Sequence, residues 1–272
     1  MTARDRRAEA GMTDSTDIVA TAHLMADAAR AAILPHFRAR DLQSDNKRAA
    51  GFDPVTEADR AAERAMRAVL AERRPEDAII GEEFGTEAGR SGISWILDPI
   101  DGTRAFICGA TSWGVLIGVS DGSGMVYGLI DQPYTGERFE GGFGIARLTG
   151  PRGVEPLRTR TGVTLDQASL MTTFPEVGTV EEGAAFRRVA EKVQLTRYGL
   201  DCYAYALLAL GQIDLVIEAG LQSYDIAGPL AVVQAAGGIV TDWQGGPAHQ
   251  GGRVLAAASP EIHAAALDLL RG

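Results

Sequence analysis

The chain has 272 residues and a net charge of −10, with apolar and charged fractions of 46% and 23% that are ordinary for a globular protein. The acidic balance argues against a surface that coats nucleic acid or an anionic membrane, because either partner would be repelled over most of the molecule. No apolar run reaches the ~18 residues of a membrane span. Cys108 and Cys202 are far apart and match no zinc spacing, so we expect reduced thiols and a cytoplasmic location.

The N-terminal half predicts two helices followed by short strands. Residues 1–15 mix charged and small residues without the apolar core of a signal peptide, and we expect a flexible tail. Apolar residues recur at helical spacing from Thr16 to about Arg40, and a second helix is expected from Thr56 to the proline at position 75. Two short strands follow, at residues 78–80 and 94–97.

The rest of the chain predicts a hairpin and then alternating strands and helices. Two β-rich runs flank Asp121-Gly122-Ser123-Gly124, which is typical of a β-hairpin. Periodicity is lost around 140–165, so we expect an N-terminal α+β domain over 16–145 and a C-terminal α/β domain over 146–272. The alternation in the second domain predicts a mainly parallel sheet covered by helices.

Acidic residues follow the predicted strands and open a late helix. They are Glu82, Asp98, Asp101 and Asp225. Brought together, they would form the all-oxygen donor set that favours magnesium or manganese over zinc or copper, and Pro99 would turn the Ile100 carbonyl inward as a further oxygen. Simpler interpretations are turn residues for DPIDG, a solvated pair for Glu82 and Glu83, and a helix N-cap for Asp225.

A further acidic motif, DPVTEAD, opens the second predicted helix. Thr56 and Asp59 fit a capping box in which Asp replaces Glu. Alternatively, Asp59 would point to the metal cluster and, with the hydroxyl of Thr103, take the proton from a metal-bound water. Glu63 and Arg67 are four residues apart on one helical face, which indicates a solvent-side ion pair.

Four blocks, DPVTEAD, GEE, DPIDGT and YDIAGPLAVVQAAGG, resemble in order and spacing the inositol monophosphatase family of magnesium-dependent, lithium-sensitive phosphatases. They lie between residues 53 and 238 and so span most of the chain. The resemblance implies a layered α-β-α-β-α sandwich that combines α+β and α/β parts. It also implies phosphomonoester hydrolysis by metal-activated water, with two or three magnesium ions per site or manganese in their place.

The same resemblance implies roles for single residues. Two magnesium ions would be bound by Glu82, Asp98, the Ile100 carbonyl, Asp101 and Asp225. The region that binds the phosphate and the nearby substrate would be formed by Asp101, Gly102, Thr103 and Arg104. Backbone N–H groups at a helix N-terminus would donate hydrogen bonds to the phosphate. Asp59 with Thr103 would activate the attacking water, and Lys47 would correspond to a family lysine near the metals.

Further segments, among them DGTRAFICG, SWGVLIG and GLIDQPYTGERF, resemble the histidinol-phosphatase branch of this family. Histidinol phosphate carries an ammonium group and a protonatable imidazole, so Asp201 and Glu218 could pair with its cationic end. Arg197 is a candidate for a phosphate or substrate clamp. The alternatives are a plain helix N-cap for Asp201 and a surface arginine for Arg197.

These features predict a histidinol-phosphatase of histidine biosynthesis that acts on a small phosphate ester, with neither nucleic acid nor membrane as partner. The rival enzymes are an inositol-1-monophosphatase and a 3′-phosphoadenosine 5′-phosphate phosphatase. A rival of another class is a metal-binding regulatory protein that has kept the fold. Because dimers are common in the family, we also expect a homodimer.

Overall fold

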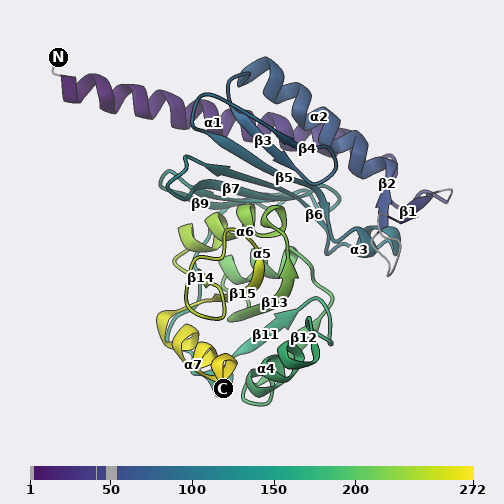
Figure 1. The fold of residues 1–272 in the computed structure, drawn as a ribbon, viewed down its shortest axis with the longest axis vertical. Helices are drawn as coiled ribbons and strands as arrows, with labels where there is room; N and C mark the ends of the chain where they lie inside the picture. Colours follow the sequence, from purple (N-terminus) through teal and green to yellow (C-terminus); the bar gives the residue numbers. More distant parts are fainter. Residues whose placement is uncertain (1–2, 41, 47–53) are drawn as a thin grey trace.

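Helical layers and β-sheets alternate through the molecule (Figure 1). The structure is a computed structural model that describes residues 3–40, 42–46 and 54–272, with side chains from Ser15 onward. The three helical layers are formed by α1 (Ala3–Ile33) with α2 (Glu57–Arg73), by α5 (Tyr203–Ala209) with α6 (Ser223–Ala235), and by α4 (Val180–Ala190) with α7 (Pro260–Arg271). An eight-stranded sheet separates the first two layers and a five-stranded sheet the last two, which confirms the α-β-α-β-α sandwich.

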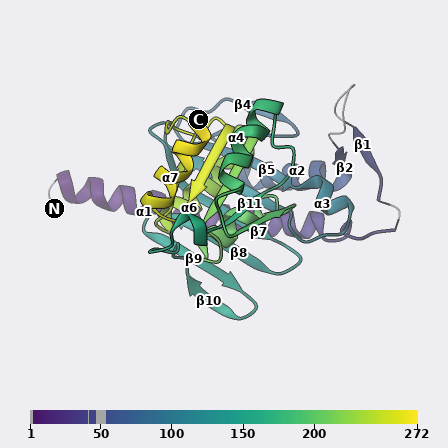
Figure 2. The same ribbon diagram turned by 90° about the horizontal axis from the view of Figure 1, so that it is seen from below.

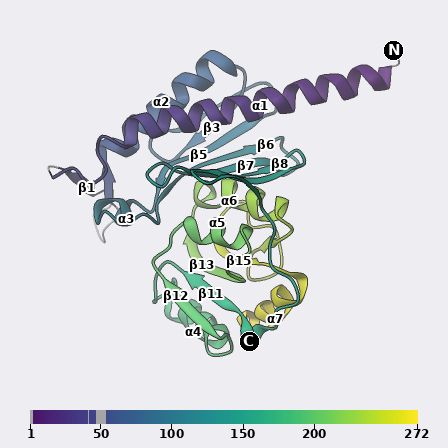
Figure 3. The ribbon, with the colours of Figure 1, turned by 180° about the vertical axis from the view of Figure 1, so that it is seen from behind.

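Helix α1 lies along the outer face of the eight-stranded sheet (Figure 3). Its buried side chains, among them Ile18, Met25 and Ile33, recur at helical spacing and form one apolar stripe. The helix begins at Ala3, so the segment expected as a tail is almost entirely helical in the structure. It ends at Ile33 rather than near Arg40, because Pro35 disfavours helical backbone in the residue before it.

The eight-stranded sheet carries the predicted hairpin in its middle. In spatial order its strands are β10 (Gly153–Pro156), β9 (Ile145–Gly150), β8 (Glu137–Gly142), β7 (Met125–Gln132), β6 (Gly114–Ser120), β5 (Ser94–Asp101), β3 (Ala78–Gly81) and β4 (Gly85–Glu87). Only β3 and β5 pair in parallel within this sheet. Because β9 and β10 belong to it, the first structural unit extends to Pro156, and the division expected between 145 and 146 would cut β9.

The second sheet is mixed rather than mainly parallel. Its strands in spatial order are β12 (Leu195–Tyr198), β11 (Ser169–Thr172), β13 (Leu215–Leu221), β15 (Gly252–Ala257) and β14 (Ile239–Thr241). β11 pairs in parallel with β12 and β13, whereas β15 runs antiparallel to both of its neighbours. The prediction of parallel strands failed there because β14 returns directly to β15 without a helical crossover.

Four short elements complete the described chain. They are the antiparallel pair β1 (Ser44–Asn46) and β2 (Pro54–Thr56), the five-residue helix α3 (Thr103–Ile107) and the 3₁₀ turn η1 (Leu165–Gln167). Figure 2 shows β1, β2 and α3 together at one end of the molecule. β2 leads directly into α2, and α3 directly follows β5.

Helix α6 lies between the two sheets and is apolar on nearly every side, as expected for a helix buried on all faces. It contacts β5, β6, β7 and β8, so its N-terminus lies near the end of β5. Across the parts of the chain that the structure describes, no helix has both the length and the apolar composition needed to cross a membrane.

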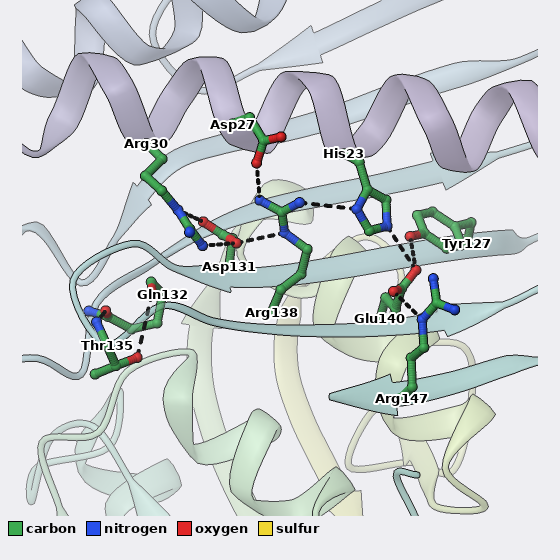
Figure 4. A network of polar contacts seen from close by, with 10 residues as sticks. All are labelled: His23, Asp27, Arg30, Tyr127, Asp131, Gln132, Thr135, Arg138, Glu140 and Arg147. Atoms are coloured by element: carbon green, nitrogen blue, oxygen red, sulfur yellow. Dashed lines mark hydrogen bonds and ion pairs between the residues drawn. The ribbon is translucent and has the colours of Figure 1, made fainter. Parts of the chain in front are cut away.

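A network of buried charges joins α1 to the outer face of the eight-stranded sheet (Figure 4). Asp131 accepts hydrogen bonds from Arg30 at 2.8 Å and from Arg138 at 2.7 Å, and Glu140 accepts one from Arg147 at 2.6 Å. Both carboxylates are fully buried. Each buried negative charge therefore has a cationic partner supplied by the chain itself, which is the condition for burying it at moderate cost.

Candidate active site

A cavity of about 270 Å³ lies where the two halves of the chain meet. Its lining comes from the end of β5, the start of α3, the end of β11, the segment before α5, the end of β13 and the start of α6. Six lining residues are acidic, and Arg104 is the one cation among those that the structure describes. This wall is strongly negative, so the cavity favours a positive ligand.

Three carboxylates form the centre of the cavity. Asp98 and Asp101 lie on β5 and Asp225 on the first turn of α6, and each offers an oxygen within 4.8 Å of the other two. Asp225 also accepts a hydrogen bond from the backbone N–H of Gln222 at 2.7 Å, so it serves as a capping residue and as part of the cluster. The predicted grouping of these three aspartates is present in the structure.

The backbone around the cluster differs from the expected turn. β5 continues through Asp98 to Asp101, and its pairing with β6 shifts register between these two residues. Such an irregularity rotates successive side chains, which lets both aspartates reach one cavity. Glu82 follows β3 in the connection to β4, not before a helix, and also lines the cavity.

Burial and mutual repulsion shift the acid–base balance of the cluster. Burial, together with the nearby carboxylates of Glu82, Asp101 and Asp225, raises the pKa of Asp98 well above its ordinary value. Burial and the charges of Asp225 and Asp201 raise the pKa of Asp101 likewise, against the opposing hydrogen bond from Cys202. Within the described residues, none of the main influences on Asp98 and Asp101 is a cation, so a bound cation would favour their ionised forms.

The donor set fits a hard divalent cation. Carboxylates from Glu82, Asp98, Asp101 and Asp225 are joined by Ile100, whose backbone also lines the cavity. The Ile100 carbonyl accepts a hydrogen bond from the Thr103 hydroxyl at 3.1 Å and keeps a second lone pair. Oxygen-only coordination of this kind suits magnesium or manganese.

Asp59 forms the predicted capping box and also lies within hydrogen-bond distance of Thr103. Its Oδ2 accepts the backbone N–H of Thr56 at 2.8 Å and so completes the capping box of α2. Its Oδ1 accepts the Thr103 hydroxyl at 3.4 Å. Asp59 is fully buried behind Thr103, which lines the cavity, so any contact between Asp59 and a ligand passes through that hydroxyl.

The segment after Asp101 forms one wall of the cavity. Gly102 has φ +82°, a left-handed conformation that favours glycine, and it caps the short helix α3. Thr103 and Arg104 follow it in the lining, and the guanidinium carbon of Arg104 lies 4.9 Å from the centre of the Phe174 ring. The residues predicted to meet a phosphate are therefore at the cavity.

Asp201 reaches the cavity and is not a helix cap. The N-cap of α5 is Cys202, with no side-chain capping bond, and the Oδ2 of Asp201 instead accepts the Ser112 hydroxyl at 2.6 Å. Burial raises the pKa of Asp201, whereas the hydrogen bond from Ser112 and the charge of Arg104 oppose the shift. Its side chain lies against Gly102, where an added Cβ would be 2.8 Å from it.

Glu218 lines the cavity from β13 and is held by two threonines. It accepts the Thr173 backbone N–H at 2.7 Å, the Thr173 hydroxyl at 2.9 Å and the Thr172 hydroxyl at 3.1 Å. Burial raises the pKa of Glu218 to about 7, and the threonine hydrogen bonds oppose this shift. Three of its roughly four acceptor positions are occupied, so about one remains for a ligand.

Several predicted positions lie elsewhere. Arg197 is exposed on the edge strand β12 and is absent from the cavity lining. Glu83 is also outside the lining, and its backbone N–H donates to Glu63. Lys47 lies outside the described residues.

Two residues at the site had no signal in the sequence. Ser112, which hydrogen-bonds Asp201, comes from the segment before β6. Tyr205 of α5 lines the cavity, and its buried hydroxyl has no hydrogen-bond partner within the described part of the chain. Its spacing within CYAYALLALG is typical of a core aromatic, so only the folded arrangement reveals its position.

The comparisons agree with this geometry. A model of the inositol monophosphatase family matches residues 14–271. The protein "Bifunctional phosphatase IMPL2, chloroplastic" of Arabidopsis thaliana is 39% identical over 270 residues, which cover 95% of this chain and 76% of that protein. "Histidinol-phosphatase" of Streptomyces coelicolor is 34% identical over 265 residues, which cover 93% of this chain and 96% of that protein.

A solved structure gives the same result for the fold. An inositol monophosphatase from Zymomonas mobilis superposes with a TM-score of 0.83 at 42% identity, over 94% of this chain and 98% of that one. Members of this family generally depend on magnesium, which accords with the oxygen-only cluster. By its match over nearly the whole length, its fold and its site, the chain is a phosphatase that belongs to the inositol monophosphatase family.

Proposed function

We propose that this phosphatase hydrolyses L-histidinol phosphate to L-histidinol and inorganic phosphate with magnesium as cofactor. The observation that carries the choice of substrate is Asp201, a carboxylate in the cavity wall beside the predicted phosphate-binding segment. Glu218 lines the same cavity from the second sheet. Two carboxylates outside the metal cluster favour an alcohol half that carries positive charge, as histidinol does.

Different residues of the chain would bind the metal ions and activate the attacking water. Asp98, Asp101, Asp225, Glu82 and the Ile100 carbonyl would hold the magnesium ions. Bound magnesium polarises the phosphate and lowers the pKa of bound water.

Hydrolysis joins the oxygen of water to phosphorus and breaks the bond between phosphorus and the ester oxygen. The Thr103 hydroxyl lies in the cavity, 3.1 Å from the Ile100 carbonyl and 3.4 Å from Oδ1 of Asp59, so its one proton can be donated to either oxygen. This hydroxyl is therefore placed to accept a proton from the attacking water and to pass its own proton to Asp59. The departing alcohol oxygen takes a proton from solvent water, and Asp59 returns its proton to the hydroxide that this step leaves.

The hydrogen bonds around the two selectivity residues leave room for a cationic ligand. Oδ2 of Asp201 accepts a hydrogen bond from the Ser112 hydroxyl, so Oδ1 can accept one from an ammonium or imidazolium group of the substrate. Glu218 is fixed in orientation by its threonines and offers its remaining lone pair. A neutral polyol needs neither charge, although the solved relative from Zymomonas mobilis makes inositol 1-phosphate the second candidate.

Phosphate release with magnesium tests the proposal. The substrates to compare are histidinol phosphate, inositol 1-phosphate, 3′-phosphoadenosine 5′-phosphate and fructose 1,6-bisphosphate. We expect the highest kcat/KM on histidinol phosphate. A higher value on inositol 1-phosphate would overturn the choice of substrate, and turnover of none of them would favour a regulatory protein that binds metal.

A further inference from the structure

Helix α2 carries a buried acidic residue that the proposed reaction does not use. Glu63 is fully buried and lies one helical turn after Asp59. The expected solvent-side pair with Arg67 is thus wrong in its location: the two side chains do pair, at 2.8 Å, but the carboxylate has no exposed surface. A buried carboxylate is costly, and its hydrogen bonds indicate what it stabilises.

Glu63 binds the backbone of the turn that carries Glu82. Its Oε2 accepts the N–H of Glu83 at 2.7 Å, and its Oε1 accepts the N–H of Phe84 at 3.2 Å. Arg67 extends the contact by donating to the carbonyl of Gly85 at 2.5 Å. The turn from β3 to β4 is therefore held by consecutive backbone groups directly after Glu82.

The residue before Glu82 is packed against the same carboxylate. A Cβ added to Gly81 would lie 2.0 Å from Oε1 of Glu63, so any larger residue would displace it. The N–H of Glu82 itself donates to the carbonyl of Leu97 on β5 at 3.2 Å. The backbone of Glu82 is thus fixed between α2 on one side and the strand that carries Asp98 on the other.

From these contacts we propose that Glu63 is a positioning residue that fixes Glu82 for metal binding. Asp59, Glu63 and Arg67 are spaced by four residues and share one face of α2. Helix α2 therefore fixes the distance between Asp59, which lies behind Thr103, and the turn that carries Glu82. The inference rests on the proposed metal site and is independent of which phosphate ester is hydrolysed.

Binding of Mn²⁺ without substrate tests this role, with free Mn²⁺ measured by electron paramagnetic resonance. Glu63→Gln keeps the size of the side chain but places an NH₂ against backbone donors, and we expect the Kd for Mn²⁺ to rise about 10–100-fold. Glu63→Asp keeps the charge and should recover part of the affinity. Glu57→Gln on the exposed face of α2 is the matched control and should bind as the wild type does.

Activity measurements separate positioning from general damage. For Glu63→Gln we expect the magnesium concentration at half-maximal rate to rise by a similar factor, whereas kcat at saturating magnesium falls much less. Arg67→Lys, which keeps the charge but loses the contact with Gly85, should weaken Mn²⁺ binding less than Glu63→Gln does. It also provides the decisive measurement if Glu63→Gln does not fold.

Two results would overturn the inference. The first is wild-type affinity for Mn²⁺ in Glu63→Gln or, if that variant does not fold, in Arg67→Lys. The second is a wild-type protein that binds no Mn²⁺, which would remove the metal site itself. Failure on histidinol phosphate alone, with Mn²⁺ binding intact, would count only against the proposed substrate.

Discussion

Two groups of buried carboxylates lie in this molecule, and their charges are balanced in opposite ways. Between α1 and the eight-stranded sheet, Asp131 and Glu140 each accept hydrogen bonds from arginine (Figure 4). In the cavity, Asp98 and Asp101 have other carboxylates as their charged neighbours. The first group is paired with cations of the chain, whereas Asp98 and Asp101 are surrounded by carboxylates within the described residues.

The pKa values of the buried carboxylates shift in opposite directions in the network and in the cavity. Burial opposes the ionisation of Glu140, but hydrogen bonds from His23, Arg147 and Tyr127 outweigh it and lower its pKa to about 2. Burial and neighbouring charge act together on Asp98 and raise its pKa. A buried acid with cationic partners stabilises the fold, and a buried acid without them is a place for a ligand.

The largest effect is expected from replacing an aspartate by asparagine, a change that can be made once in the cavity and once in the network. Asp98→Asn should lower phosphate release about a thousandfold or more, because it replaces a carboxylate oxygen of the proposed metal-binding cluster with an NH₂ group. Without metal, the variant should melt no lower than the wild type, since one repelling charge is gone. The measurements are phosphate release and thermal melting in a chelator.

Asp131→Asn is the matched control for that comparison. It should lower the melting temperature and leave the activity of the folded fraction near the wild-type value, because Asp131 is not among the residues that line the cavity. Full activity in Asp98→Asn would refute the metal assignment, and an inactive but stable Asp131→Asn would mean that the network serves the site directly.

The next largest effect, a loss of thermal stability, is expected from removing an arginine of the network. Arg138→Met leaves Asp131 with Arg30 as its remaining arginine, and removing one partner of a buried pair costs about 3–5 kcal/mol. Thermal melting should show a loss of roughly 10 °C for a chain of this size. Arg90→Met is the control, because its pair with Glu76 is exposed to solvent and should change the melting temperature little.

Magnesium should stabilise the cavity and leave the network unchanged. At a concentration 100 times its Kd, a single bound ion adds about 2.7 kcal/mol to the free energy of unfolding. We expect this increment in the wild type and in Arg138→Met, and a much smaller one in Asp98→Asn. Equal increments in Asp98→Asn and the wild type, measured by melting with and without chelator, would place the bound ion elsewhere.

A smaller effect is expected at Asp201, which has a hydroxyl partner in Ser112. Asp201→Asn should lower kcat/KM for histidinol phosphate about tenfold more than for a simple aryl phosphate, as loss of one charge-assisted hydrogen bond would. The aryl phosphate serves as the control, because it has no cationic group. Equal losses on the two substrates would show that Asp201 only supports the cavity wall.

The grouping of the acidic residues could be predicted from the sequence because each carboxylate lies in a short motif at the end of a regular element. Asp98 and Asp101 follow an apolar run, and Asp225 opens a helix. Local patterns of this kind fix where a side chain leaves the scaffold. The layered fold followed from the same blocks, whereas the antiparallel return of β15 required knowledge of tertiary pairing.

The residues that surround the cluster could not be predicted in this way. In the sequence, Glu63 and Arg67 are indistinguishable from an exposed pair four residues apart, since only packing decides that the carboxylate meets a backbone turn. Asp201 has the spacing of a helix cap, but its φ of +46° turns it toward Ser112. Arg197 is near Asp201 in sequence, but it is exposed on the edge strand β12 and does not line the cavity.

The smallest predicted effect is the dependence of network stability on acid. Because the pKa of Glu140 is lowered from 4.5 to about 2 on folding, its contribution is complete above pH 4.5 and is lost as the pH falls toward about 2. Glu140→Gln should therefore show a weaker decline in melting temperature between these values, measured in chelator so that metal release does not contribute. An unchanged decline would mean that other groups govern acid unfolding. A steeper decline would mean that His23, Arg147 and Tyr127 do not stabilise the ionised form of Glu140. The contrast between the network and the carboxylates of the cavity would then be refuted.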